Sequence, residues 1–335
     1  MAERTCSKFS RTAVWISRLA VSACFIFSGF VKAVDPVGTQ IKIQDYLSAF
    51  GAGTCQDSLI LPFACLLAGL EFVLGVYLLF GMYRNGTTLL LLTVLALFTP
   101  FTLYLAIANP VSDCGCFGDA VTLSNWQTFL KNVVLLLMAI YVRIYRSLVK
   151  PLIQRREWLF SLAVVIIAVL FMRYNVRNLP VLDFRPYKIG VDLRSGVLEG
   201  RDDTFGDFFL MDSELNDVTA DVLESDGFLF LLVAPHLDDA SQRNVDRIND
   251  LCSFCIENGY PLYCVTASGT DEAGRWAVAT CAEYDFLFAD EIPLQTMIRS
   301  NPGVVVIRDG VIIDKWSDVN IPVDSDIPAL LGKWE

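Results

Sequence analysis

The first 172 residues of the chain contain five long apolar runs. They cover Ala13–Val34, Leu59–Phe80, Thr87–Ala108, Trp126–Ile144 and Trp158–Met172. A helix that crosses a bilayer needs about 20 apolar residues, with about 17 as the usual lower limit. The first four runs meet this limit, whereas the fifth is shorter and is also compatible with a core helix of a soluble domain. Because tilt or local thinning of the bilayer accommodates a modest mismatch, we predict five transmembrane helices.

The second half of the chain alternates short apolar strands with polar-faced helices. The predicted elements are, in order, the strands FGDFFLMD and GFLFLLVAP, a helix over Asp239–Asn258, the strand PLYCVTA, a helix over Asp271–Tyr284 and the hairpin NPGVVVIRDGVIIDKW. Within the hairpin, Asp309–Gly310 is a strong signal for a two-residue turn. The pattern predicts an α/β domain over residues 204–335.

Composition and charge divide the chain in the same way. Of the 335 residues, 54% are hydrophobic and 19% are charged, and the mean hydropathy is +0.49, which is unusual for a soluble globular protein. Residues 1–173 carry 14 Lys or Arg and 8 Asp or Glu, a net charge of +6, whereas residues 174–335 carry 12 and 29, a net charge of −17. The acidic second half argues against nucleic acid as a partner.

The loops between the apolar runs alternate between basic and acidic. The basic segments contain Arg4, Lys8, Arg11, Arg84, Arg146, Lys150, Arg155 and Arg156. The other two loops are acidic, with Lys42 as their one base. Because Lys and Arg favour the cytoplasmic side, this pattern predicts a multi-pass protein of the cytoplasmic (inner) membrane whose N-terminus is cytoplasmic. Residues 109–124 then face outward, and a fifth span places the acidic domain in the periplasm; without that span the domain is cytoplasmic.

Arg18, Lys32 and Glu71 are charged residues inside the first two apolar runs, where charges are costly and therefore informative. At 1.5 Å per residue, Glu71 lies about 14 Å from the inner end of its apolar run and Arg18 about 8 Å from the inner end of its own, a gap of about 6 Å in depth. Lys32 and Glu71 are instead separated by about 15 Å in depth. An Arg side chain can bridge the smaller gap, but a Lys side chain cannot bridge the larger one. We therefore predict a structural ion pair between Arg18 and Glu71.

The sequence DCGCFGDA places Cys114 and Cys116 one glycine apart in the second acidic loop. As a redox dithiol, the two cysteines would close a small, strained ring, and strained, exposed disulfides exchange readily. As a metal site they supply two of the four ligands that structural zinc requires, so we expect no metal. As a structural element, one of them could pair with Cys55 in the other outer loop. The dithiol is favoured over this loop-stapling disulfide.

The first half of the chain resembles the DoxX/MauE-like group of four-helix membrane proteins. The resemblance rests on SRLAVSACFIFSGFVKAVDP, on AGLEFVLGVYLLFG around Glu71 and on DCGCFGDA before Trp126. It is greatest to a Bacteroidetes branch in which such a bundle precedes a thioredoxin-like domain. The resemblance implies a thiol-linked role, because MauE-type proteins are associated with the maturation of disulfide-bearing periplasmic enzymes. Related bundles of the DsbB and vitamin K epoxide reductase type use quinones, so the cofactor is unknown and a quinone is one candidate.

The second half is similar to the thioredoxin fold, and particularly to its peroxiredoxin and TlpA-like branch. On this resemblance Pro302 is the candidate cis-proline. The usual dithiol would follow the strand FLFLLVAP, where the sequence instead has residues 236–239, His-Leu-Asp-Asp, so the usual thioredoxin chemistry is absent. His236 and Asp238 could be catalytic, but an aspartate that caps a helix is the simpler interpretation.

A second cysteine pair, Cys252 and Cys255, lies near the end of a predicted helix, where the helix dipole disfavours a thiolate. We interpret these two cysteines, together with Cys264 and Cys281, as buried core residues. One buried disulfide between Cys252 and Cys255 is an alternative if the domain is periplasmic, and a redox role for this pair is a further alternative.

The predicted fold is a membrane α-helical bundle, comprising a four-helix DoxX/MauE-like domain and a fifth span, followed by an α/β thioredoxin-like domain. The domains are residues 10–148, a basic loop with the fifth span and linker over 149–203, and residues 204–335. The leading functional hypothesis is thiol–disulfide maturation of a periplasmic client protein by Cys114 and Cys116, with enzymatic activity undecided. A non-enzymatic membrane scaffold is the alternative, and a small-molecule transporter ranks last.

Overall fold

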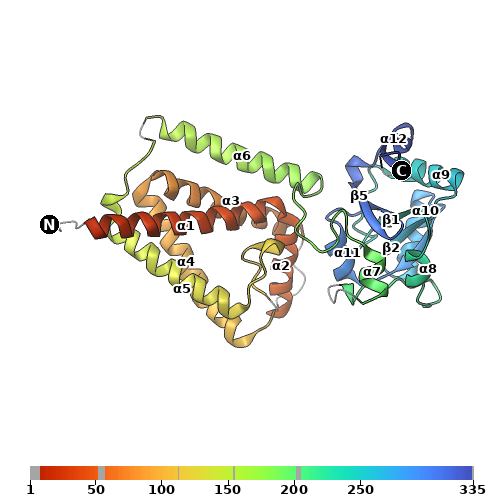
Figure 1. The fold of residues 1–335 in the computed structure, drawn as a ribbon, viewed down its shortest axis with the longest axis horizontal. Coiled ribbons are helices and arrows are strands. Elements are labelled where there is room, and N and C mark those ends of the chain that lie inside the picture. Colours follow the sequence, from red (N-terminus) through yellow and green to blue (C-terminus); the bar gives the residue numbers. More distant parts are fainter. Residues whose placement is uncertain (1–7, 52–56, 112, 154, 201–204, 334–335) are drawn as a thin grey trace. The chain divides into compact units, whose positions relative to one another are not determined.

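The computed structural model describes residues 8–51, 57–111, 113–153, 155–200 and 205–333. The chain divides into two compact units, Met1–Val176 and Arg177–Glu335, each described separately below (Figure 1). Arg4, Cys6 and Cys55 lie outside the described residues. The predicted alternative of a disulfide between the two outer loops involves Cys55, so it lies outside them as well.

Five helices of the first unit are long and apolar enough to cross a membrane, as predicted. They are α1 (Lys8–Val34), α3 (Asp57–Phe80), α4 (Arg84–Ala108), α5 (Asn125–Ile144) and α6 (Glu157–Arg177). The fifth, α6, has 21 residues, because the helix continues past the apolar run through Arg173 to Arg177. Its length therefore satisfies the requirement for a span. The protein is a multi-pass membrane protein that contacts the lipid bilayer.

Helix α1 packs closely against α3 because two glycines remove side chains from the contact. A Cβ atom on Gly29 would lie 2.3 Å from the backbone nitrogen of Phe72, and one on Gly75 would lie 2.7 Å from that of Ile26. Small residues allow membrane helices to approach in this way. The two glycines also fix the relative height of the helices: Gly29 lies beside Ala68 and Phe72, so the first part of α3 extends beyond the end of α1.

We expect Gly29→Ala to destabilise the bundle by about 1–3 kcal/mol, because the added methyl group meets backbone atoms that cannot move aside. Gly86→Ala is the matched control, since a Cβ atom there meets nothing within 4 Å. Thermal unfolding in detergent should show a lower midpoint for the first variant and an unchanged or higher midpoint for the second. Equal midpoints would contradict the proposed register of α1 and α3.

A helix that the sequence analysis did not predict, α2 (Pro36–Ala49), follows α1 directly. The Asp35 side chain caps it by accepting a hydrogen bond from the Gly38 backbone nitrogen at 2.8 Å, and Pro36 occupies the first turn. Both features favour a helix start. The helix was missed because its apolar residues are too few to form a transmembrane run.

The second unit is built on a mixed five-stranded sheet in the order β3-β2-β1-β4-β5. Its strands are β1 (Phe228–Val233), β2 (Leu262–Thr266), β3 (Asp285–Phe288), β4 (Gly303–Arg308) and β5 (Val311–Ser317). Strands β1, β2 and β3 are parallel, and β4 is antiparallel to both β1 and β5. Asp309 and Gly310 both have positive φ, as the two-residue hairpin turn requires. Alternate residues of the buried strand β1 face the two halves of the core.

Short helices cover both faces of this sheet (Figure 1). They are α7 (Leu193–Leu198), α8 (Thr219–Leu223), α9 (Val245–Asn258), α10 (Thr270–Thr280), α11 (Glu291–Met297) and α12 (Ile327–Leu331). The predicted strand FGDFFLMD is wrong, because only Met211 in it makes isolated bridges, to Asp217 and Phe288. Its apolar side chains Phe205, Phe208 and Leu210 are buried without a regular strand.

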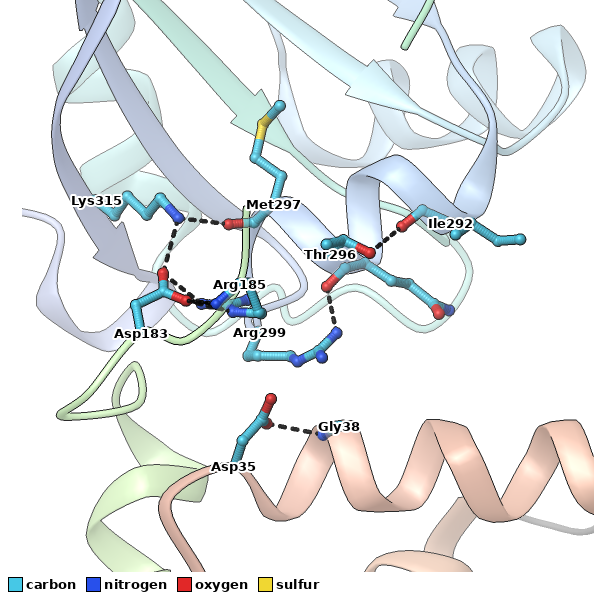
Figure 2. A network of polar contacts seen from close by, with 10 residues as sticks. Asp35, Gly38, Asp183, Arg185, Ile292, Thr296, Met297, Arg299 and Lys315 are labelled. Carbon is cyan, nitrogen blue, oxygen red and sulfur yellow. Dashed lines mark hydrogen bonds and ion pairs between the residues drawn. The ribbon is translucent and has the colours of Figure 1, made fainter. Parts of the chain in front are cut away.

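A buried charge network fixes the segment before α7 to the sheet (Figure 2). The Asp183 carboxylate accepts hydrogen bonds from Arg185 Nε at 2.7 Å and from Lys315 Nζ on β5 at 3.1 Å. Lys315 Nζ also donates to the Met297 carbonyl at 2.8 Å. Desolvation by burial lowers the pKa of Lys315 to about 8, although Asp183 opposes the shift. This network holds residues 183–185 against the domain core.

Candidate functional site: the Cys-Gly-Cys loop

The loop between α4 and α5 carries Cys114 and Cys116 and is closed at its base by side-chain hydrogen bonds. Asn125 Nδ2 donates to Asn109 Oδ1 and to the Val111 carbonyl, both at 2.8 Å. Gly115 has φ +62° and Gly118 has φ +51°, values that favour glycine. The glycine between the two cysteines is therefore required by the turn that brings them together.

The Sγ atoms of Cys114 and Cys116 lie 2.9 Å apart, and both cysteines are free thiols. A disulfide bond is about 2.05 Å long, so the two sulfurs need move by only about 1 Å to form one. At the observed separation one thiol donates a hydrogen bond to the other sulfur. The loop can therefore hold the pair as a dithiol and oxidise it with little rearrangement.

Helix α2 supports the Cys114 side of the loop. Tyr46 donates a hydrogen bond to the Cys114 carbonyl at 2.7 Å, and Lys42 Nζ pairs with Asp113 at 2.5 Å. Desolvation by burial raises the pKa of Tyr46, so its hydroxyl stays a donor. Sequence analysis missed this contribution because the helix itself was not predicted.

Three polar side chains on α1 and α3 support the Cys116 side. Ser28 Oγ lies 2.7 Å from the Cys116 carbonyl oxygen and 2.7 Å from Glu71 Oε2. Lys32 Nζ lies 2.7 Å from both carboxylate oxygens of Glu71 and 3.2 Å from Ser28 Oγ. The Lys32 and Glu71 side chains are only 7% and 9% exposed. A buried polar network therefore lies directly beneath the cysteine loop.

The predicted ion pair between Arg18 and Glu71 is wrong, because Lys32 is the partner of Glu71. The prediction compared depths by assuming that the apolar runs of α1 and α3 begin and end at the same level in the membrane. The glycine contacts instead shift α3 along α1 toward the end that carries the cysteine loop, which brings Glu71 to the level of Lys32. Arg18 lies near the opposite end of the bundle, where it donates to the carbonyls of Leu78, Leu79 and Lys150. It thus donates to carbonyls in the last turn of α3, where the Leu78 carbonyl also accepts from the Gly81 backbone nitrogen.

A cavity of about 50 Å³ is lined by Cys116 together with residues of α1, α3, α4 and α5. Its polar lining comes from Cys24, Ser28, Lys32, Glu71, Cys116, Lys131 and Asn132. Lys131 Nζ lies 4.1 Å from the centre of the Phe117 ring, beside Cys116. Sequence analysis missed Lys131 and Ser28, although a lysine within an apolar run is a signal that could have identified Lys131.

The two thiols have opposite electrostatic environments. The hydrogen bond from Cys114 lowers the pKa of Cys116 to about 6, and Lys131 and Lys32 contribute to this shift against desolvation by burial. The same hydrogen bond and desolvation raise the pKa of Cys114. The thiolate is the reactive form of cysteine, so the surroundings of Cys116 favour that form more than those of Cys114 do.

The cysteines of the second unit do not form a comparable pair. Cys252 and Cys255 are free and buried on α9 within the core, so the alternative of a disulfide between them is not formed. Burial raises the pKa of Cys255 to about 12. Cys264 is buried as predicted, whereas Cys281 is exposed, because α10 ends at Thr280 and Cys281 is its left-handed cap. These cysteines are therefore buried core residues, apart from Cys281.

The region where a thioredoxin dithiol would lie is occupied by hydrogen bonds within the chain. The Asn301–Pro302 peptide bond is cis, at the candidate cis-proline. Asn301 Nδ2 donates to the His236 carbonyl at 2.7 Å, and the His236 ring contacts Glu291 at 2.9 Å. Asp238 pairs with Arg275 at 3.3 Å and does not cap α9, which begins at Val245. Among the described residues, no group of three or more His, Cys, Asp or Glu side chains could hold a metal ion.

Comparisons with known proteins find partial similarities. Protein TlpB of Flavobacterium psychrophilum is 25% identical over 130 residues, which cover 37% of this chain and 35% of TlpB; the chain thus spans about a third of that relative. A mutant of peroxiredoxin Q from Xanthomonas campestris is 12% identical, with a TM-score of 0.29 over 38% of this chain and 92% of that one. Thiol peroxidase from Chromobacterium violaceum is also 12% identical, with a TM-score of 0.28 over 38% and 82%.

The sheet order and the cis-proline describe the second unit as thioredoxin-like. The sequence model of the methylamine utilisation protein MauE family matches residues 10–145, which include α1 to α5 and the cysteine loop. Residues 10–145 therefore form a MauE family domain, to which a fifth span and a thioredoxin-like unit are joined.

Proposed function

We propose that this membrane protein exchanges disulfides with envelope client proteins through Cys114 and Cys116. The observation that carries the proposal is the pair of sulfurs 2.9 Å apart, one of which is stabilised as a thiolate. The membrane location, the MauE family domain and the thioredoxin-like unit support a thiol-redox role. The proposed exchange partner is a protein disulfide or dithiol, the group with which a thiolate exchanges.

The distribution of basic residues supports an outward-facing cysteine loop. Arg146 Nε donates to Asn85 Oδ1 at 3.0 Å, so the α3–α4 turn and the end of α5 lie at the same end of the bundle. Arg84, Arg143 and Arg146 gather at this end, whereas the loop with Cys114 and Cys116 connects the opposite ends of α4 and α5. Basic loops favour the cytoplasm. The proposed orientation thus places the loop in the periplasm, and α6 carries the acidic unit to the same compartment, where it contributes to client binding.

The exchange proceeds in two steps that conserve electrons. The Cys116 thiolate attacks one sulfur of a client disulfide, forming a mixed disulfide and releasing the other client sulfur as a thiolate. Cys114 then loses its proton and attacks the Cys116 sulfur, forming the Cys114–Cys116 bond and releasing the second client sulfur. Two electrons pass from the loop to the client, and the reverse sequence oxidises a client dithiol.

Differential alkylation of native membranes followed by mass spectrometry tests the proposal. Cys114 and Cys116 should be protected after mild oxidation and should regain reactivity after reduction, whereas buried Cys264 should remain unlabelled throughout. An impermeant maleimide added to intact cells, with the outer membrane permeabilised, should label the exposed Cys281 if the acidic unit is periplasmic. A loop that stays reduced under all conditions would favour a non-enzymatic scaffold, in which Cys-Gly-Cys only shapes the loop.

A further inference from the structure

The stretch that follows the apolar part of α6 differs in charge from the rest of the second unit. Residues 173–190 carry four Lys or Arg and one Asp, a net charge of +3, whereas residues 191–335 carry 9 and 28, a net charge of −19. The one acid, Asp183, is paired with both Arg185 and Lys315. Basic residues next to a membrane span are attracted to anionic lipid headgroups, which repel an acidic surface. Charge alone therefore favours residues 173–190 as the part of the unit that faces lipid.

The same stretch exposes a cluster of apolar side chains. Val181, Leu182 and Phe184 are 57%, 45% and 40% exposed, and we call these three residues the apolar patch. Single exposed apolar residues are normal on a protein surface. Three within four consecutive residues form a local patch, and such patches mark contacts with a protein or a membrane.

The buried charge network holds the apolar patch in place (Figure 2). Arg185, whose side chain is 2% exposed, donates to Asp183, and Asp183 accepts from Lys315 Nζ on β5. Asp183 and Arg185 are thus fixed to the domain core, and Leu182 and Phe184, which alternate with them, remain exposed. Residues 180 and 186 on either side are prolines, which restrict the backbone further. The patch is therefore ordered before it binds, which lowers the entropic cost of binding.

The length of α6 places the apolar patch within reach of the bilayer surface. The apolar run Trp158–Met172 is about 22 Å long, whereas a hydrocarbon core is about 30 Å thick. The exposed Tyr174 and Arg177 therefore lie where the headgroup region begins, and both are residue types typical of that region. The five residues from Arg177 to Leu182 extend by at most about 18 Å. The patch thus continues a contact with lipid that α6 already makes.

We propose that the apolar patch inserts into the headgroup region of the leaflet in which α6 ends, while Arg177 and Lys188 contact the phosphates of anionic lipids. Both basic side chains are exposed, as this contact requires. The partner is the bilayer itself, and the acidic remainder of the second unit is turned away from it by charge repulsion. This inference is independent of the chemistry proposed for Cys114 and Cys116.

Photo-crosslinking of the full-length protein in lipid vesicles tests this inference. The crosslinker 4-benzoylphenylalanine replaces Leu182 or Phe184, and mass spectrometry identifies lipid adducts after irradiation. We expect adducts at both positions. Val278 on α10 is the matched control position, because it is 84% exposed and lies in the acidic part of the unit. The same crosslinker there should yield few or no lipid adducts.

Two further comparisons test the role of charge. Adding the anionic lipid phosphatidylglycerol to phosphatidylcholine vesicles should raise the yield of adducts at Phe184. Arg177→Gln and Lys188→Gln should each lower it by up to about fivefold in the anionic vesicles. Leu182→Asp should lower it without changing the thermal unfolding midpoint, because the Leu182 side chain is exposed and contributes little to the domain core.

The results that would overturn the inference are equally specific. Lipid adducts at Leu182 and Phe184 that are no more frequent than at Val278 would reject insertion of the apolar patch. Adducts with a second protein chain in place of lipid would assign the patch to a protein partner and also reject it. Equal yields in vesicles with and without phosphatidylglycerol would overturn the role given to Arg177 and Lys188.

Discussion

Replacing Cys116 by serine should abolish disulfide exchange, because the residue supplies the reactive thiolate. With a pKa of about 6 for Cys116, thiolate at pH 7 is about 30-fold more abundant than for an ordinary thiol of pKa about 8.5. The lower basicity also reduces intrinsic nucleophilicity by about tenfold, which leaves a net gain of about threefold. At pH 6 the thiolate ratio rises to about 150 and the net gain to about 15-fold. The advantage of Cys116 is therefore larger in mildly acidic than in neutral solution.

The pH dependence of alkylation measures this effect. The rate constant for Cys116 should rise through pH 6 and level off above pH 7, because deprotonation is then complete. Cys114 should react appreciably only in alkaline solution, since its pKa is raised. Cys114→Ser is the matched variant: it should retain the first attack and accumulate a mixed disulfide on Cys116. A low-pH reactive thiol that persists in Cys116→Ser would reverse the roles of the two cysteines.

The second large effect is expected for Arg18→Leu, which should destabilise the bundle by about 3 kcal/mol or more. Arg18 is 1% exposed and donates to three backbone carbonyls at the end of α3 and at Lys150. An orphaned buried acceptor costs about 1–3 kcal/mol. Unfolding in lipid vesicles, followed by tryptophan fluorescence, measures the loss. Arg146→Leu, an exposed arginine at the same end of the bundle, should change stability by less than about 0.5 kcal/mol.

A double-mutant cycle distinguishes the two pairings considered for Glu71. Arg18→Leu and Glu71→Gln should be additive to within about 0.5 kcal/mol, because Arg18 does not contact Glu71. Lys32→Met and Glu71→Gln should instead show coupling of about 0.5–3 kcal/mol, as residues in one hydrogen-bonded network do. Coupling between Arg18 and Glu71 without coupling between Lys32 and Glu71 would refute the observed register of α1 and α3.

Much of the fold could be predicted from local patterns. Apolar runs identified all five candidate spans, because a bilayer imposes a minimum length on each helix independently; four runs met this length, and the fifth was predicted by allowing for tilt or local thinning. The hairpin at Asp309–Gly310 and the alternation of strands and helices likewise depend on nearby residues. The segment FGDFFLMD was mistaken for a strand because burial of Phe205, Phe208 and Leu210 does not require a β ladder.

The candidate site was predicted only in part. Cys114 and Cys116 were found because a single glycine separates them, but Tyr46, Ser28 and Lys131 come from three other segments and carry no shared sequence signal. The error over Arg18 and Glu71 has one cause. Depth along a helix can be calculated from the sequence, whereas the offset between two helices depends on which side chains are small enough at their contact.

The sequence by itself determined the membrane-spanning helices, the basic and acidic loops, the thioredoxin-like order of strands and the missing dithiol after β1. These features follow from chain length, residue type and nearest-neighbour geometry. Tertiary structure alone decided that Lys32 is the partner of Glu71 and that Ser28 links this pair to Cys116. The physical reason is that Gly29 and Gly75 let two helix backbones approach closely at one register, and that register sets which buried charges meet.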